Sequence, residues 1–297
     1  MIPVFFSPKQ VVEDDVGISP SARKPPLVIQ SWKDTGFPIE IHEPAPASIE
    51  DFERAHDPDF VRGVLSCQIP NGFGNTLPSV AASLPWTSGS MLSAARYLLK
   101  NRGRPVAVSP TSGFHHASYG AAEGFCTFNG LMVTVQALRA DGFDGRIGIL
   151  DLDEHYGNGT DDIIRKCGVR DVRHYTFGAE PLKRRSKNDG IPGFSWIHHL
   201  PERIKSFDDC ELVLYQAGAD PHEHDPYSRG LLSTEMLAQR DKVVFQGLQA
   251  LDIPVVWNLA GGYQTPLRKV LDIHDNTMRA CVETFCGGPT MGGAYPP

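Results

Sequence analysis

Asp151, Asp153 and His155 occupy alternate positions in the segment DLDEHYGNGT, residues 151–160. In an extended chain alternate side chains point to the same face, so two carboxylates and an imidazole converge there. Burying them together is costly unless a cation neutralises them. Zinc accepts both ligand types, and a catalytic zinc site uses three protein ligands. We expect Asp153 and His155 to bind a metal with Asp225 as the third ligand; the alternative is an acidic loop with a salt-bridged histidine.

Two further motifs contain residues suited to hydrolysis. The adjacent histidines His115 and His116 lie in SGFHHA, and because histidine titrates near neutral pH, such a pair can take up and return a proton. They could equally bind a metal or lie at the surface. Tyr263 follows two glycines, and its hydroxyl could donate to a developing oxyanion. The alternative for Tyr263 is a simple glycine-rich turn.

The elements that would position these residues alternate along the chain. Four continuously apolar runs read as strands buried on both faces, at 105–109, 146–150, 211–215 and 254–259. Helical patterns accompany them, at 87–100, 130–138 and 233–251, and Ser48 with Asp51 forms a capping box that predicts another helix start. Alternating strands and helices predict a parallel sheet, in which ligands bind beyond the carboxyl ends of the strands. A polar motif follows each of the four runs, so we expect one shared site.

Composition excludes several classes of protein. The 297 residues are 41% hydrophobic and 21% charged, which is typical of a globular protein and not of a disordered one. The net charge of −7 argues against general nucleic-acid binding. No apolar run approaches the roughly 18–20 residues of a membrane span. Six cysteines without a CxxC pair suggest reduced thiols, and we expect a cytoplasmic protein. We expect a catalytic domain over 1–286 and a loose tail over 287–297.

Six segments together resemble the histone deacetylase and acetylpolyamine amidohydrolase family. They are HDPDFV at 56–61, SGFHHA at 112–117, GFCTFN at 124–129, DLDEHYGNGT at 151–160, GADPHEHDP at 218–226 and AGGY at 260–263. The resemblance extends from about Asp57 to Leu271. It implies the arginase–deacetylase fold, a single α/β domain with a mainly parallel sheet of about eight strands. It also implies one catalytic metal per chain, usually zinc.

The resemblance implies a role for each matching residue. His116 would be the general base and acid, with Asn158 as its partner, and His115 would be the electrostatic partner, with Asp151 behind it. Tyr263 would polarise the acyl carbonyl. A substrate channel would be lined by Gly124, Phe125, Leu232 and Gly262. A potassium site would involve Asp151, Asp153, His155 and Thr176.

These motifs predict metal-assisted removal of an acetyl or other acyl group from an amine, such as acetyl-lysine or an acetylpolyamine. Two alternatives stay open: an arginase-type ureohydrolase with two manganese ions, and a catalytically weak acyl-amine binding protein. Tyr156 motivates the second alternative, because the family usually has a histidine there. The region 177–199 lacks the familiar rim pattern, and the roles of His222 and His224 stay open between a metal site and loop residues. The expected partners are small-molecule or peptide acyl amines, without nucleic acid or membrane.

Overall fold

The computed structural model describes residues 1–183 and 193–287. Its strands are β1 (Ile2–Phe5), β2 (Ile39–His42), β3 (Val106–Ser109), β4 (Ile147–Asp151), β5 (Val172–Thr176), β6 (Leu212–Gln216) and β7 (Val255–Asn258). Its helices are α1 (Lys24–Asp34), α2 (Ile49–Glu53), α3 (Pro58–Leu65), α4 (Pro78–Lys100), α5 (Gly130–Ala140), α6 (Asn158–Lys166), α7 (Gly193–Lys205), α8 (Thr234–Ala250) and α9 (Arg268–Phe285). Two short 3-10 turns lie at Pro8–Gln10 and Phe177–Ala179.

The strands form one parallel sheet in the order β2-β1-β3-β7-β6-β4-β5. The four strands expected from their apolar runs are the adjacent central ones, β3, β7, β6 and β4. Nearly all their residues are fully buried, as the continuous apolar pattern predicts. The described residues contain seven strands where about eight were expected. All four central strands end at the same edge, so the loops that follow them meet there.

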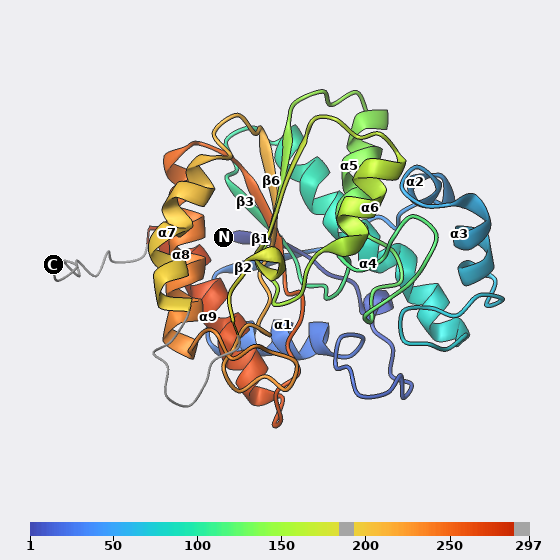
Figure 1. Cartoon of the computed structure of the whole chain (residues 1–297), viewed down its shortest axis with the longest axis horizontal. Helices are drawn as coiled ribbons and strands as arrows, with labels where there is room; N and C mark the ends of the chain where they lie inside the picture. Colours follow the sequence, from blue (N-terminus) through green and yellow to red (C-terminus); the bar gives the residue numbers. More distant parts are fainter. Residues whose placement is uncertain (184–192, 288–297) are drawn as a thin grey trace, which may run out of the picture.

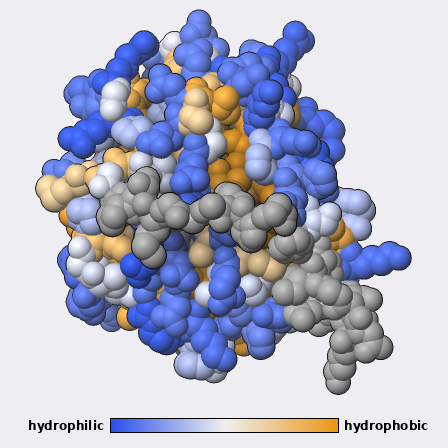
Figure 2. Space-filling view, turned by 90° about the vertical axis from the view of Figure 1, so that its left-hand side faces the viewer, coloured by the Kyte–Doolittle hydropathy of each residue, from blue (hydrophilic) through white to orange (hydrophobic). Residues whose placement is uncertain are grey.

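Helices cover both faces of the sheet (Figure 1). Helices α7, α8 and α9 lie on one face together with α1, and α4, α5 and α6 lie on the other with α2 and α3 beyond them. Figure 2 shows the outer surface of the α7–α9 layer, where hydrophilic residues predominate. In α9 the buried residues recur every three or four positions, which is the pattern of a helix with one face on a core.

Two helix starts test the expectations from sequence. The capping box of Ser48 and Asp51 is present at the start of α2, as predicted. Helix α4 begins at Pro78, nine residues before the predicted start at 87, because the helix continues through Pro85. The described residues contain no helix long and apolar enough to cross a membrane. Apart from Gly287, the expected loose tail lies outside the described residues.

His56, the first residue of the motif HDPDFV, forms two buried hydrogen bonds. It has no exposed surface; its Nδ1 lies 2.9 Å from the Ser118 carbonyl oxygen, and its Nε2 accepts from the Asn129 N–H at 2.9 Å. Because Nε2 accepts, the ring is neutral with its proton on Nδ1. Burial lowers the pKa of His56 to about 4, and the carbonyl contact opposes this only in part.

We therefore predict a loss of stability as pH falls from about 6.5 to about 4. In that window the unfolded chain binds a proton at this position that the folded chain cannot bind, at a total cost of about 3 kcal/mol. Urea unfolding at a series of pH values, with a chelator present, measures it. His56→Gln, which keeps a donor and an acceptor, should reduce the slope by about one proton; an unchanged slope would contradict the assignment.

Candidate metal and acid–base site

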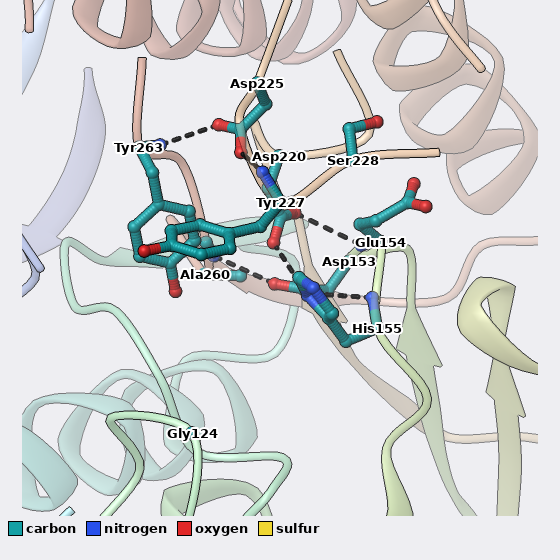
Figure 3. Close-up of polar contacts among 12 residues, drawn as sticks. Gly124, Asp153, Glu154, His155, Asp220, Asp225, Tyr227, Ser228, Ala260 and Tyr263 are labelled. Carbon is teal, nitrogen blue, oxygen red and sulfur yellow. Dashed lines mark hydrogen bonds and ion pairs between the residues drawn. The ribbon is translucent and has the colours of Figure 1, made fainter. Parts of the chain in front are cut away.

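Asp153, His155 and Asp220 form a compact group beyond the ends of β4 and β6 (Figure 3). One ligand atom from each lies within 4.8 Å of the others. The Nδ1 atom of His155 is 3.2 Å from both Asp153 Oδ1 and Asp220 Oδ2. Among the described residues this is the one such group of histidine, cysteine or acidic side chains. Two carboxylates and an imidazole match the ligand types of a catalytic zinc site.

Asp220 completes this group, which differs from the expectation that Asp225 would do so. Both carboxylate oxygens of Asp225 accept backbone N–H groups instead, Oδ2 from Tyr263 at 2.7 Å and Oδ1 from Tyr227 at 3.1 Å. The strand register contains the missing signal. Asp151 pairs with Gln216 across β4 and β6, so His155 and Asp220 each lie four residues beyond a paired position.

The carboxylates of Asp153 and Asp220 are buried side by side. Burial and the neighbouring Asp153 together raise the pKa of Asp220 to about 7, although His155 opposes them. For His155, burial lowers the pKa but hydrogen bonds to the two carboxylates outweigh it and raise the pKa to about 11. Asp220 Oδ2 is buried, and apart from its 3.2 Å contact with His155 Nδ1 it has no hydrogen-bond partner among the described residues. A Cβ on Gly261 would lie 2.1 Å from that oxygen, so the glycine keeps this space open. A buried acceptor of this kind fits a cation.

The two adjacent histidines have different environments. His115 Nδ1 contacts Asp151 Oδ2 at 2.7 Å, and its Nε2 lies 3.6 Å from Asp153 Oδ1. Burial lowers the pKa of His115, but Asp151 and Asp153 outweigh it and raise the pKa to about 9. Burial and the neighbouring His115 together lower the pKa of His116. At neutral pH His115 is therefore cationic and His116 is a free base.

Asn158 and Glu123 determine which nitrogen of His116 carries the proton. His116 Nδ1 lies 2.7 Å from Asn158 Oδ1, and Asn158 Nδ2 donates to Glu123 Oε2 at 3.1 Å. Because the carboxylate can only accept, the amide nitrogen points toward Glu123 and the amide oxygen toward His116. The imidazole proton then lies on Nδ1, and Nε2 keeps a lone pair. The sequence motifs predicted Asn158 as a site residue but gave no indication of Glu123.

Aromatic rings lie beside the metal group. The ring centroids of Phe125 and Tyr263 are 5.8 Å apart, and those of Tyr263 and Tyr227 are 5.0 Å apart in an edge-to-face arrangement. Phe73 extends the row at 6.1 Å from Phe125. Burial raises the pKa of Tyr263 well above its ordinary value, and nearby carboxylates raise it further, so its hydroxyl stays protonated as a donor. Of these four aromatic residues, Phe125 and Tyr263 were predicted as site residues from the resemblance, and Tyr227 and Phe73 were not foreseen.

The turn from Ala260 to Tyr263 is held at three points. Lys24 Nζ donates to the Ala260 carbonyl oxygen at 2.8 Å, the Gly261 N–H donates to Asp153 Oδ2 at 2.9 Å, and Asp225 accepts from the Tyr263 N–H. Lys24 has no exposed surface, and burial lowers its pKa to about 8 although Asp220 and Asp153 oppose this. No sequence signal identifies Lys24, because a lysine is normally exposed.

Other expected site residues have different surroundings. Leu232 has no exposed surface and packs in the hydrophobic core, so the structure does not place it on an open channel wall. Gly262 is buried, where a Cβ would lie 2.8 Å from Val270 and 3.0 Å from Ala219. Thr176 pairs with Asp151 across β4 and β5, and its hydroxyl accepts from the Gly157 N–H at 3.1 Å.

The remaining polar side chains near the site are engaged elsewhere. His222 Nε2 lies 2.9 Å from the Thr234 hydroxyl, and its Nδ1 accepts from the His224 N–H, which favours a loop-shaping role for His222. Tyr156 is exposed and donates its hydroxyl to Asp161, away from the metal group. Part of the region 177–199 lies outside the described residues.

Gly124 offers a test of how closely the ring of His116 is confined. Its φ is +55°, and a Cβ there would lie 2.5 Å from His116 Cδ2. Gly124→Ala should displace the imidazole and disrupt its contact with Asn158, which NMR of the histidine ring nitrogens would detect. Gly168→Ala is the matched control, because Gly168 has a φ of +61° and nothing within 4 Å. Both variants share a backbone strain of about 1–2 kcal/mol. Equal loss of stability and an unchanged His116 spectrum would contradict the predicted collision.

Comparison with known proteins identifies the family. The model of the histone deacetylase domain matches residues 21–177 and 191–279. An uncharacterized protein of Picosynechococcus sp. is 27% identical over 275 residues, covering 84% of this chain and 87% of that protein. The acetylpolyamine amidohydrolase of Burkholderia pseudomallei is 25% identical, covering 93% of this chain and 84% of the relative. A probable deacetylase of Archaeoglobus fulgidus is 26% identical, covering 76% and 69%.

The fold agrees with this match. The crystal structure of acetylpolyamine aminohydrolase from Burkholderia pseudomallei superimposes with a TM-score of 0.70 at 18% identity, over 95% of this chain and 99% of that one. This likeness establishes the arginase–deacetylase fold, and the family model extends over most of the chain, including every motif of the site. The chain therefore belongs to the histone deacetylase family of amide-hydrolysing enzymes.

Proposed function

We propose that this chain is a zinc-dependent amidohydrolase that removes an acetyl or other acyl group from an amine. The observation that supports it is the arrangement of Asp153, His155 and Asp220 beside a neutral imidazole, His116, and a protonated phenol, Tyr263. Acyl transfer to water needs these three functions: an electrophilic centre, a base that becomes an acid, and a donor to the oxyanion. The substrate class is a small-molecule or peptide acyl amine.

The residues present suit a zinc ion. Asp153, His155 and Asp220 would hold it, because they offer carboxylate oxygens and one imidazole nitrogen, and Asp220 Oδ2 has no partner beyond its contact with His155. When bound, zinc supplies Lewis-acid chemistry, which polarises an amide carbonyl and makes an attacking water more acidic. A potassium site near Asp151 and Thr176 remains part of the proposal.

His116 moves the proton. Its Nε2 lone pair, left free because Asn158 accepts from Nδ1, takes a proton from water as the water attacks the acyl carbon. The cationic His115 beside it, at a ring distance of 4.0 Å, makes the protonated state of His116 unfavourable. The proton therefore passes readily to the departing amine, and the carbon–nitrogen bond breaks. The products are the free amine and the carboxylic acid.

Tyr263 stabilises the oxyanion. Its hydroxyl stays protonated, and its backbone is fixed through Asp225. A well-placed donor of this kind contributes about 3–4 kcal/mol to the stabilisation of the transition state.

Two alternatives are less well supported. An arginase-type site needs two metal ions with bridging carboxylates, whereas the described residues contain one group of suitable ligands. A binding protein without catalysis has no need of a free imidazole base with a fixed tautomer. We therefore expect one equivalent of metal per chain and measurable turnover.

Zinc titration into the metal-free protein tests the expectation of one metal ion per chain. At pH 7 His155 is protonated and the pKa of Asp220 is raised, so binding should release at least one proton. Affinity should thus rise at least about tenfold per pH unit near neutrality. Calorimetry in buffers of different ionisation enthalpy measures both quantities. Asp220→Asn should weaken binding by about 100-fold or more. Two equivalents of tightly bound metal would favour the arginase alternative.

Acetate release from acetyl-lysine peptides and acetylpolyamines tests the chemistry. Tyr263→Phe should retain its zinc and lose about 100- to 1000-fold in kcat. Tyr97→Phe is the matched control, because Tyr97 lies away from the site against Phe5 and His42, and its activity should be unchanged. Turnover by the Tyr263 variant at the parent rate would overturn the role of Tyr263. Absence of any turnover by the zinc-loaded parent would overturn the proposed function.

A further inference from the structure

Asp225 is a buried carboxylate that the proposed chemistry does not use. Only 6% of its surface is exposed, and it is not a member of the metal-ligand group. Its two oxygens accept from two different backbone N–H groups, those of Tyr263 and Tyr227. These residues come from different loops, one following β7 and the other following β6. A single side chain therefore joins two loops at the mouth of the site.

The two hydrogen bonds of Asp225 also restrict how the rings of Tyr227 and Tyr263 lie relative to each other (Figure 3). Tyr227 and Tyr263 meet edge to face, with ring centroids 5.0 Å apart and planes at 87°. Tyr227 is 44% exposed, so its ring has solvent on one side and Tyr263 on the other. Phe125 also lies beside Tyr263, with ring centroids 5.8 Å apart. Because both tyrosine backbones are held by one carboxylate, neither ring can shift far without breaking a charge-assisted hydrogen bond.

The chemistry of Asp225 suits this task and is hard to replace. A carboxylate has two acceptor oxygens and no donor, so it can accept both N–H groups at once. An asparagine has the same shape, but it has one acceptor oxygen and presents N–H to the second N–H group. One of the two bonds must then be lost. The loop geometry should change even though the volume does not.

We propose that Asp225 is a positioning residue that holds Tyr263 and Tyr227 as one unit, with the ring of Tyr227 forming a wall for the aliphatic stem of the acyl amine. This rests on the proposed function, because it assigns Tyr263 as the oxyanion donor. Asp225 then acts on catalysis through Tyr263 and on substrate affinity through Tyr227, without binding the metal.

Backbone amide exchange of the metal-free protein tests the clamp without any activity measurement. In Asp225→Asn, the amide of Tyr263 or of Tyr227 should exchange at least about tenfold faster. Asp252→Asn is the matched control, since Asp252 lies at the opposite end of the sheet with a φ of +56° that asparagine tolerates. Zinc binding by Asp225→Asn should stay within about threefold of the parent. A loss of zinc binding like that of Asp220→Asn would make Asp225 a metal ligand and overturn the inference.

Kinetics of a double-mutant cycle test how the clamp acts. Asp225→Asn should lower kcat by about 10- to 100-fold in the parent and by less than about twofold in the Tyr263→Phe background. Tyr227→Ala should raise KM several-fold with a smaller change in kcat. An undiminished effect of Asp225→Asn without the Tyr263 hydroxyl would show that it acts elsewhere. If the parent hydrolyses no acyl amide, the proposed function fails, and the exchange and zinc data still decide whether Asp225 is a clamp or a ligand.

Discussion

Three carboxylates, Asp153, Asp220 and Asp225, are buried together at one edge of the sheet, and the surrounding structure must compensate their charge. Three kinds of group compensate this charge. They are the imidazole of His155, the backbone N–H groups of the 260–263 turn, and the ammonium group of Lys24, which donates to the carbonyl of Ala260 in that turn. Each donor belongs to a different loop or helix. The cluster can therefore form only when the parallel sheet brings these segments together, which ties the chemistry of the site to the whole fold.

The glycine-rich turn at residues 260–263 both stabilises the acidic cluster and positions Tyr263. Asp153 and Asp225 accept from its N–H groups, and Lys24 donates to its carbonyl, so both polarities of the backbone are used. Gly261 leaves room for the oxygens of Asp220 and Asp153, which any side chain would occupy. The turn thus ends in Tyr263 at a fixed position. The same hydrogen bonds that stabilise the acidic cluster therefore also fix the backbone of Tyr263.

The sequence was sufficient for the central sheet and for most residues of the site. Continuous apolar runs predicted the buried strands. The alternate positions of Asp153 and His155 in the segment 151–155 predicted that the two side chains lie on one face. Prediction from the sequence failed where the role of a residue depends on contacts between loops. Asp220 and Asp225 are both aspartates beyond β6, and only the folded loops show that Asp220 joins Asp153 and His155 while Asp225 accepts two backbone N–H groups. The two edge strands, β2 and β5, mix polar with apolar residues and are only partly buried, so they lack the apolar runs that marked the central strands. Strand β1 is apolar and buried but was not predicted.

The acidic residues near the site also give His115 and His116 different charges at neutral pH. His115 lies against Asp151 and Asp153 and becomes cationic, whereas the hydrogen bond of His116 Nδ1 goes to the neutral amide of Asn158. A carboxylate at position 158 would favour a cationic His116, which cannot act as a base until it loses that proton. An amide fixes the tautomer without adding charge. The choice of asparagine, oriented by Glu123, therefore keeps the second histidine free to accept a proton while the first already carries one.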